Sequence, residues 1–195
     1  MTERLIRPHG GELKELLVDS ARAAELKGAS RDWPSWDLRD RQARDLELIL
    51  NGGFSPLTGF LNRNDYQEVR DRMRLADGTL WPIPVTLDVS RELASKLSAG
   101  DQLALRDAEG VLLAVLTVGD VWEPDRTEEA GKVFGTTSTH HPGVDYLLTH
   151  SGPMYVGGAL EGVQLPAHFD FKRDRHTPRE LRDEFSRLGW RNVVG

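Results

Sequence analysis

The sequence predicts an α+β fold in which one packed domain is followed by the truncated start of an α/β unit. Hydrophobic residues make up 38% of the 195-residue chain and charged residues 29%, a composition typical of a chain with a packed core. Stretches with the two-residue alternation of strands are interspersed with stretches of helical periodicity. A stretch of poor periodicity at residues 164–174 then separates a final helix and strand from the rest.

Two helices are predicted in the first fifty residues. The first covers residues 20–26 and is expected to end at Gly28. The second covers residues 41–50, with an apolar face formed by Leu46, Ile49 and Leu50. We expect Asp40 to be its N-cap, because a carboxylate there can accept from the free N–H groups of the first turn. The glycines of Asn51-Gly52-Gly53 favour termination directly afterwards.

A third helix is predicted to run to Met73, with Asn62 or Asn64 as its N-cap, and the Asp77-Gly78 pair is typical of a turn. Alternating apolar residues then predict strands, and residues 107–110 form a plausible hairpin turn between two of them. The expected strands cover residues 85–89, 102–106, 111–122 and 154–160, and the expected short helices residues 90–97, 127–134 and 146–150. Gly157-Gly158 indicates a bulge or bend in the last strand.

The end of the chain carries a strong helix-start signal after the aperiodic stretch. Thr177 is a good N-cap, Pro178 suits the first helical position, and Glu180 completes a capping box. Gly189 is expected to end this helix, and an apolar strand is predicted from residue 190 to 194. We therefore expect that a second α/β unit begins here and is cut within its first strand.

Charge and composition exclude several classes of function. The formal net charge is −6, which argues against the basic face of a nucleic-acid-binding protein. The chain has no cysteine, so disulfides, cysteine nucleophiles and thiolate metal sites cannot form. No apolar run approaches the length that crosses a membrane, and no signal peptide is recognisable. We expect a cytoplasmic protein with neither a nucleic-acid nor a membrane partner.

The common phosphate-binding and metal-binding patterns are absent from the sequence. The one glycine-lysine pair, Gly131-Lys132, has Arg126 where a phosphate loop needs its first glycine. No histidines have the H-x-x-H or H-x-x-x-H spacing of a local metal site; the six are His9, His140, His141, His150, His168 and His176. The adjacent pair His140-His141 could contact a metal or a phosphate, but a polar loop is the favoured interpretation.

Other candidate residues each allow a chemical and a structural interpretation. Asp45 and Glu47 could form an acid–base pair, but residues two apart on a helix diverge, which favours a solvated face. The loop at residues 55–60 either packs structurally or contacts a ligand or another domain. Arg4 and Arg7 could bind an anion such as sulfate, although terminal arginines are usually solvated.

The tryptophans offer no clear site either. They are scattered along the chain, which favours core or interface anchors over a base-stacking platform; they are Trp33, Trp36, Trp81, Trp122 and Trp190. No residue is therefore assigned a catalytic, cofactor-binding or metal-binding role.

Several ordered stretches nevertheless resemble one family. Residues 45–61, DLELILNGGFSPLTGFL, resemble the signature of the N-terminal domain of ATP sulfurylases (sulfate adenylyltransferases). Further matching stretches follow in the same order, namely residues 81–87, 141–144, 155–158, 177–185 and 189–190. The resemblance implies a PUA-like, barrel-forming domain with flanking short helices over residues 1–165. Residues 166–195 would then be a linker and the start of a nucleotidyltransferase catalytic domain.

The family transfers AMP from ATP, bound with Mg, to sulfate, and releases adenosine 5′-phosphosulfate and pyrophosphate. Its catalytic Q-x-R-N-P and H-x-x-H motifs follow the strand that here ends at Gly195, and neither motif occurs in this sequence. The resemblance therefore implies an inactive scaffold without cofactors, which packs on its own catalytic domain and supports a homo-oligomer. The alternative is a stand-alone PUA-like module that binds RNA or a small anion.

Overall fold

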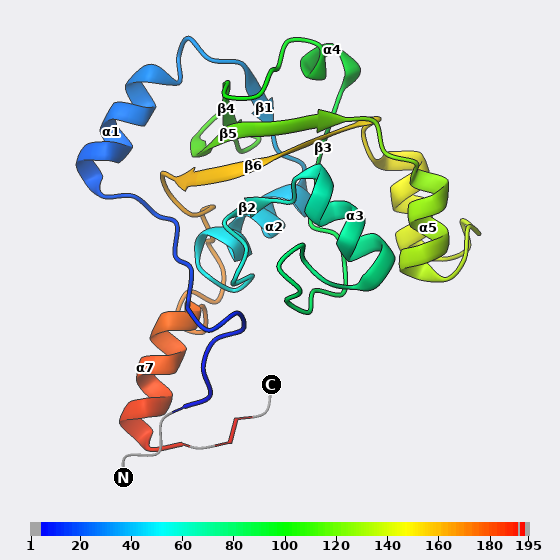
Figure 1. The fold of residues 1–195 in the computed structure, drawn as a ribbon. Coiled ribbons are helices and arrows are strands. Elements are labelled where there is room, and N and C mark those ends of the chain that lie inside the picture. Colours follow the sequence, from blue (N-terminus) through cyan, green and yellow to red (C-terminus); the bar gives the residue numbers. More distant parts are fainter. Residues whose placement is uncertain (1–4, 191, 194–195) are drawn as a thin grey trace.

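The computed structural model describes residues 5–190 and 192–193, and its strands form one six-stranded mixed sheet with helices packed around it (Figure 1). The strands are β1 (Ser35–Asp37), β2 (Gly59–Phe60), β3 (Leu87–Val89), β4 (Gln102–Arg106), β5 (Leu112–Trp122) and β6 (Met154–Gly162). The helices are α1 (Ser20–Ala29), α2 (Asp40–Leu50), α3 (Arg63–Arg72), α4 (Arg91–Ala94), α5 (Arg126–Phe134), α6 (Pro142–Asp145), the π-helical turn η1 (Tyr146–His150) and α7 (Pro178–Leu188). The predicted α+β class is confirmed.

The long strands β5 and β6 form the centre of the sheet. Their antiparallel ladder is flanked by β4 on one side and by β2 and β3 on the other, in the order β1-β4-β5-β6-β2 with β3 also paired to β6. The ladder register shifts between Val118 and Asp120, so that Gly119 bulges opposite Gly157 and Gly158. A Cβ at Gly158 would lie 2.1 Å from the Thr117 carbonyl oxygen, and one at Gly157 would lie 2.3 Å from the Leu61 carbonyl oxygen. The glycine pair is therefore required by close backbone approach.

The main apolar core lies between the sheet and the helices that cover it. The predicted apolar face of α2 is confirmed, because Leu46, Ile49 and Leu50 are completely buried. They pack in one cluster with strand residues such as Leu103 and Leu116. Burial of each such side chain stabilises the fold by about 1.5–3 kcal/mol relative to exposure.

The first residue of each helix is set by local hydrogen bonds and not only by the preference of single residues for the N-cap position. Asn62 caps α3 by accepting from the Asp65 N–H at 2.8 Å, as one of the two predicted alternatives. The prediction for α2 was wrong, since Asp40 is its first helical residue and Arg39 is the N-cap. The Gln42 side chain, at the third helical position, accepts from the N–H of the N-cap Arg39 at 3.0 Å, as the third residue of a capping box does. Helix α1 also continues past Gly28 to Ala29.

Three short elements were not predicted. β1 has three residues, β2 has two and α6 has four, and such lengths are too short to show a period. β1 pairs in parallel with β4 across a long stretch of sequence, with Trp36 opposite Leu105. Its existence depends on that tertiary pairing and not on its own residues.

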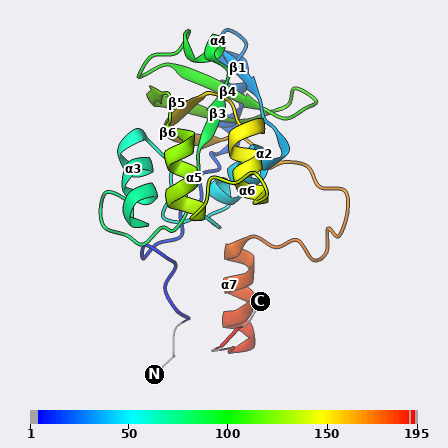
Figure 2. The same ribbon diagram turned by 90° about the vertical axis from the view of Figure 1, so that its right-hand side faces the viewer.

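Residues 164–177 contain no helix or strand, and α7 lies below the sheet beside the N-terminal segment (Figure 2). The capping box of Thr177 and Glu180 forms as predicted, and Gly189 ends the helix with a φ of +67°. Arg179 forms an ion pair with Glu15, and the Arg182 guanidinium donates to the Ile6 carbonyl oxygen. A strand was predicted for residues 190–194, but residues 190, 192 and 193 form none, because no strand of the described chain lies beside them. Residues 191 and 194 lie outside the described part.

The close approach at the glycine pair gives a stability prediction. We expect Gly158→Ala to lower the free energy of unfolding by about 2 kcal/mol or more, because the new methyl group would overlap the Thr117 carbonyl. Gly131→Ala is the matched control, since it lies within α5 with its nearest neighbour atom 4.0 Å away, and it should raise stability by about 0.5–1 kcal/mol. Urea unfolding measures both. Equal effects of the two substitutions on the free energy of unfolding would contradict the requirement for glycine at position 158.

Candidate functional site

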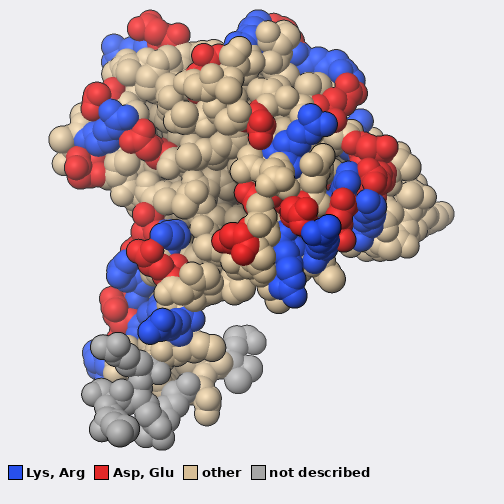
Figure 3. Space-filling model, viewed as in Figure 1, with Lys and Arg blue, Asp and Glu red and all other residues tan. Residues whose placement is uncertain are grey.

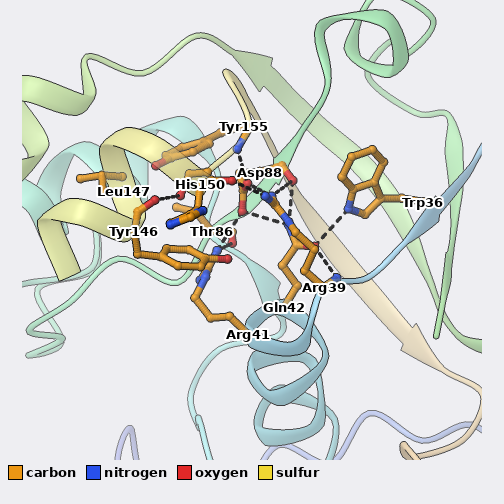
Figure 4. A network of polar contacts seen from close by, with 12 residues as sticks. Trp36, Arg39, Arg41, Gln42, Thr86, Asp88, Tyr146, Leu147, His150 and Tyr155 are labelled. Carbon is orange, nitrogen blue, oxygen red and sulfur yellow. Dashed lines mark hydrogen bonds and ion pairs between the residues drawn. The ribbon is translucent and has the colours of Figure 1, made fainter. Parts of the chain in front are cut away.

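A buried carboxylate, Asp88, lies at the centre of a polar network that joins several elements (Figure 4). β3 places Asp88 between Leu87 and Val89, and all three residues are 0% exposed. The start of α2 approaches from the other side, so that Arg39, Arg41 and Gln42 converge on the carboxylate. A charge without water around it must be paired and hydrogen-bonded, and this network meets that requirement.

Both oxygens of Asp88 are fully engaged. Oδ1 accepts from Arg41 Nη2 at 2.9 Å and from Gln42 Nε2 at 2.9 Å. Oδ2 accepts from the Arg39 guanidinium and from the Gly152 N–H. Gln42 Nε2 also donates to the Asp88 carbonyl oxygen at 2.7 Å. A carboxylate that accepts from four donors has no lone pair left for proton transfer, so its role is structural.

The two arginines extend the network to other elements. Arg41 Nη1 donates to Asp45 Oδ2 at 2.7 Å, and its guanidinium lies 5.4 Å from the centre of the Tyr146 ring. Burial raises the pKa of Asp45, while the Arg41 charge acts in the opposite direction. Arg39 Nη1 donates to the His150 carbonyl oxygen. The network thus connects α2 and β3 to the π-helical turn η1.

A second buried carboxyl group, Glu129 on α5, lies among aromatic side chains. Its Oε2 accepts from the hydroxyls of Tyr66 and Tyr155, each at 3.0 Å. The two tyrosine rings and Trp122 contact one another with ring centres 5.6–5.8 Å apart. Burial raises the pKa of Glu129, and the Glu129 carboxyl together with burial raises the pKa values of both tyrosines. The two tyrosines therefore keep their hydroxyl protons and act as donors to the Glu129 carboxyl group.

The histidines do not gather at one place. His140 is exposed, and His141 Nδ1 accepts from the Gly143 N–H at 3.2 Å, which caps α6. His168 contacts Glu47 on α2, whereas Nε2 of His9 lies 2.7 Å from the Leu80 carbonyl oxygen. His150 and His176 are exposed. In the described residues, no group of three or more histidine, aspartate or glutamate side chains is arranged to hold a metal ion.

The other sequence candidates also have structural partners. Asp45 contacts Arg41 and Glu47 contacts His168, so the two carboxylates point to different neighbours. In the loop at residues 55–60, Ser55 is buried, accepts from the Lys14 N–H at 2.9 Å and donates to the Gly52 carbonyl oxygen at 2.7 Å. The packed-loop interpretation therefore agrees with the structure.

The remaining candidates are dispersed. Trp81 and Trp122 belong to the main core and Trp36 packs against it, whereas Trp33 packs on a smaller cluster and Trp190 stacks on Phe185. Lys132 forms ion pairs with Asp71 and Glu128. Arg7 is exposed, and Arg4 lies outside the described residues. Over the described ranges, no helix combines the length and the apolar character needed to cross a bilayer.

Sequence reasoning missed the polar residues that the fold brings together. Arg39, Arg41 and Gln42 look like an ordinary polar helix start, and Glu129 looks like a solvated helical residue. The local signal at Asp88 is its polar position in the alternation with Leu87 and Val89, which favours a solvated face, whereas the structure buries both faces of β3. The partners of Asp88, 46 to 49 residues away, could not be identified from that signal.

The network predicts a large cost for loss of its central charge. We expect Asp88→Asn to lower the free energy of unfolding by about 3–5 kcal/mol, since both arginines would lose their buried counter-charge. Asp71→Asn is the matched control, because Asp71 also contacts two cations, Arg70 and Lys132, but at the surface, and should change stability by less than about 1 kcal/mol. Similar urea midpoints for the two variants would show that the network is not a main source of stability.

Comparison with known proteins agrees with the resemblance in the sequence. The chain is 50% identical over 190 residues to a sulfate adenylyltransferase of Kluyveromyces lactis, covering 96% of this chain and 38% of that protein. It is 48% identical over 190 residues to a sulfate adenylyltransferase of Saccharomyces cerevisiae, covering 96% of this chain and 37% of that protein. The chain thus spans little more than a third of the length of these curated relatives.

A solved structure and a family model both match the fold of this chain. The structure described as a hexameric APS kinase from Thiobacillus denitrificans superposes with a TM-score of 0.76 at 36% identity, covering 96% of this chain and 33% of that one. The family model described as a PUA-like domain matches residues 6–165, from the N-terminal segment to the end of the sheet. The chain therefore belongs to the PUA-like domain family.

Proposed function

We propose that this chain is the N-terminal part of a sulfate adenylyltransferase, in which it acts as a non-catalytic scaffold. The observation that carries the proposal is the identity of about 50% to proteins of that name over 96% of the chain. In the parent enzyme, AMP would pass from ATP, bound with Mg, to sulfate, as a step of sulfate assimilation in the cytoplasm. The chemistry would be performed by parts of the enzyme that correspond to the unmatched two-thirds of the relatives.

The polar contacts of the described residues support a scaffold role. Transfer of AMP to sulfate depends on cationic groups that are free to stabilise charge on the reacting phosphate and on sulfate. The half-buried guanidiniums of Arg39 and Arg41 are instead paired with Asp88 and Asp45. The polar network around Asp88 therefore holds α2, β3 and η1 together, and the guanidiniums of Arg39 and Arg41 are not free to serve the reaction.

The helix α7 supports a packing role. None of its residues is buried, yet Leu181, Phe185 and Leu188 recur at helical spacing, and Trp190 stacks on Phe185. We propose that this apolar stripe packs on the catalytic domain. In this proposal residues 1–165 form the PUA-like domain, and residues 166–195 are the linker and the beginning of the catalytic domain. Contacts between such domains would also support a homo-oligomer.

Surface charge gives no support to the RNA-binding alternative. On the face in Figure 3, lysine and arginine side chains lie among aspartate and glutamate side chains and form no continuous basic stripe. Several arginines are also engaged in ion pairs, as in Arg70 with Asp71 and Glu128. RNA binding depends on neutralising many phosphates with free cations, which this arrangement does not favour.

The proposal predicts that the 195-residue chain is inactive alone. We expect no pyrophosphate release from ATP, Mg and sulfate above a protein-free blank, measured with a coupled pyrophosphatase assay. The Kluyveromyces lactis relative serves as the positive control. Turnover by the isolated chain that scales with its concentration would contradict the scaffold assignment.

The stripe on α7 predicts a position-specific effect in a full-length enzyme. A chimera in which this chain replaces the matching segment of the Kluyveromyces lactis relative provides that context. We expect Phe185→Asp to lower the free energy of unfolding of the chimera by about 3 kcal/mol or more, because a charge would be buried at the domain contact. Ser186→Asp, the next residue on the exposed side of α7, introduces the same charge and should change stability by less than about 0.5 kcal/mol. Equal unfolding midpoints would exclude α7 as the contact.

A further inference from the structure

A cavity of about 290 Å³ lies between the sheet and the helices α5, α6 and η1. Its walls combine apolar and aromatic side chains with two ionisable groups, namely Ile83, Pro84, Phe134, Tyr146, Arg41 and Glu129. Figure 4 shows Arg41 and Tyr146 facing each other, with Tyr155 nearby. A small, mostly apolar cavity with a few converging polar groups has the character of a small-molecule site.

The helical side of the cavity packs as a unit of its own. Ala130, Val144 and Leu147 form a small apolar cluster that is separate from the main core, with Phe134 and Leu148 against it. The cavity thus lies at the boundary between two apolar clusters. One wall is η1, and π-helical turns are frequent at functional sites.

Glu129 has an unused acceptor at this cavity. The residue is only 5% exposed, and both tyrosine hydroxyls donate to the same oxygen, Oε2. Within residues 5–190 and 192–193, no donor forms a hydrogen bond with Oε1. Oε1 is not completely buried, so it can accept a hydrogen bond from a donor bound in the cavity that Glu129 lines.

Glu129 forms no ion pair within the described residues, because the nearby cations that influence it are paired with other carboxylates. The positive charges of Arg39 and Arg41 are matched by the negative charges of Asp45 and Asp88, which pair with them directly. Arg70, the other cation that influences Glu129, pairs with Asp71 and Glu128. Ionised Glu129 is therefore left without an ion-pair partner, and a bound cation would supply it.

We propose that this cavity binds a small organic cation, an ammonium or amidinium group that donates to Glu129 Oε1, with a one-ring apolar body against Ile83, Pro84 and Phe134. The size agrees, because 290 Å³ is at the lower end of the range for ligand pockets. The aromatic walls at Phe134 and Tyr146 provide faces that attract a cation. The proposal is independent of the scaffold role, since it concerns only residues within the PUA-like domain.

The test is titration of the 195-residue chain with benzamidine, benzylamine and cyclohexylamine, with benzyl alcohol as the uncharged control. We expect saturable one-site calorimetric binding with a Kd of about 1 mM or tighter for at least one cation. Glu129→Gln should weaken that binding at least tenfold. Glu128→Gln is the matched control, since it removes the same charge from the adjacent, 40% exposed side chain and should leave the affinity unchanged.

A second pair of variants covers the case in which Glu129→Gln does not fold. Ile83→Ala, at the cavity, should weaken binding at least threefold, whereas Leu80→Ala, outside the cavity, should leave binding unchanged. The side chains of Ile83 and Leu80 are 48% and 51% exposed, so neither substitution disturbs the core. The proposal is overturned if no cation binds saturably, if benzyl alcohol binds as tightly as the cations, or if the cavity variants bind like their controls.

Discussion

The carboxylate of Asp88 is the contact on which the arrangement of the other elements depends. Asp88 lies in β3, which pairs with β6, and it fixes the start of α2 through the side chains of Arg39, Arg41 and Gln42. Arg39 and Arg41 then carry the constraint to η1. Burying these charges is costly, so the network does not merely add stability; it penalises any other orientation of α2 and η1, in which a charge would lose its partner.

The long periodic elements could be predicted from sequence because their signal is local. The apolar face of α2, the β4–β5 hairpin and the capping box of α7 each depend on residues within a few positions of one another. The N-cap of α2 was mistaken because Arg39 occupies that position, where the Gln42 side chain accepts from its N–H, although arginine has no side-chain acceptor of its own. β1 and the partners of Asp88 could not be predicted, because they depend on pairing across about 46–70 residues of chain.

The stretch that carried the family resemblance turns out to be architectural. Residues 45–61 form the second half of α2, a tight loop and β2, and in them Leu46, Ile49, Leu50 and Phe60 are buried. The apolar pattern of this stretch reflects the packing of α2 and β2 in the core and says nothing directly about chemistry. This explains how a sequence without a recognisable active site could still identify its family so specifically.

The capping box of α7 has a consequence for assembly. Thr177 and Glu180 satisfy the first-turn donors and Gly189 closes the last turn, so the helix is formed before any partner contacts its apolar stripe. A preformed helix loses little backbone entropy on docking, whereas a disordered segment would have to be ordered at that moment. If α7 packs on a catalytic domain as proposed, the free energy gained by covering the stripe is then available for affinity.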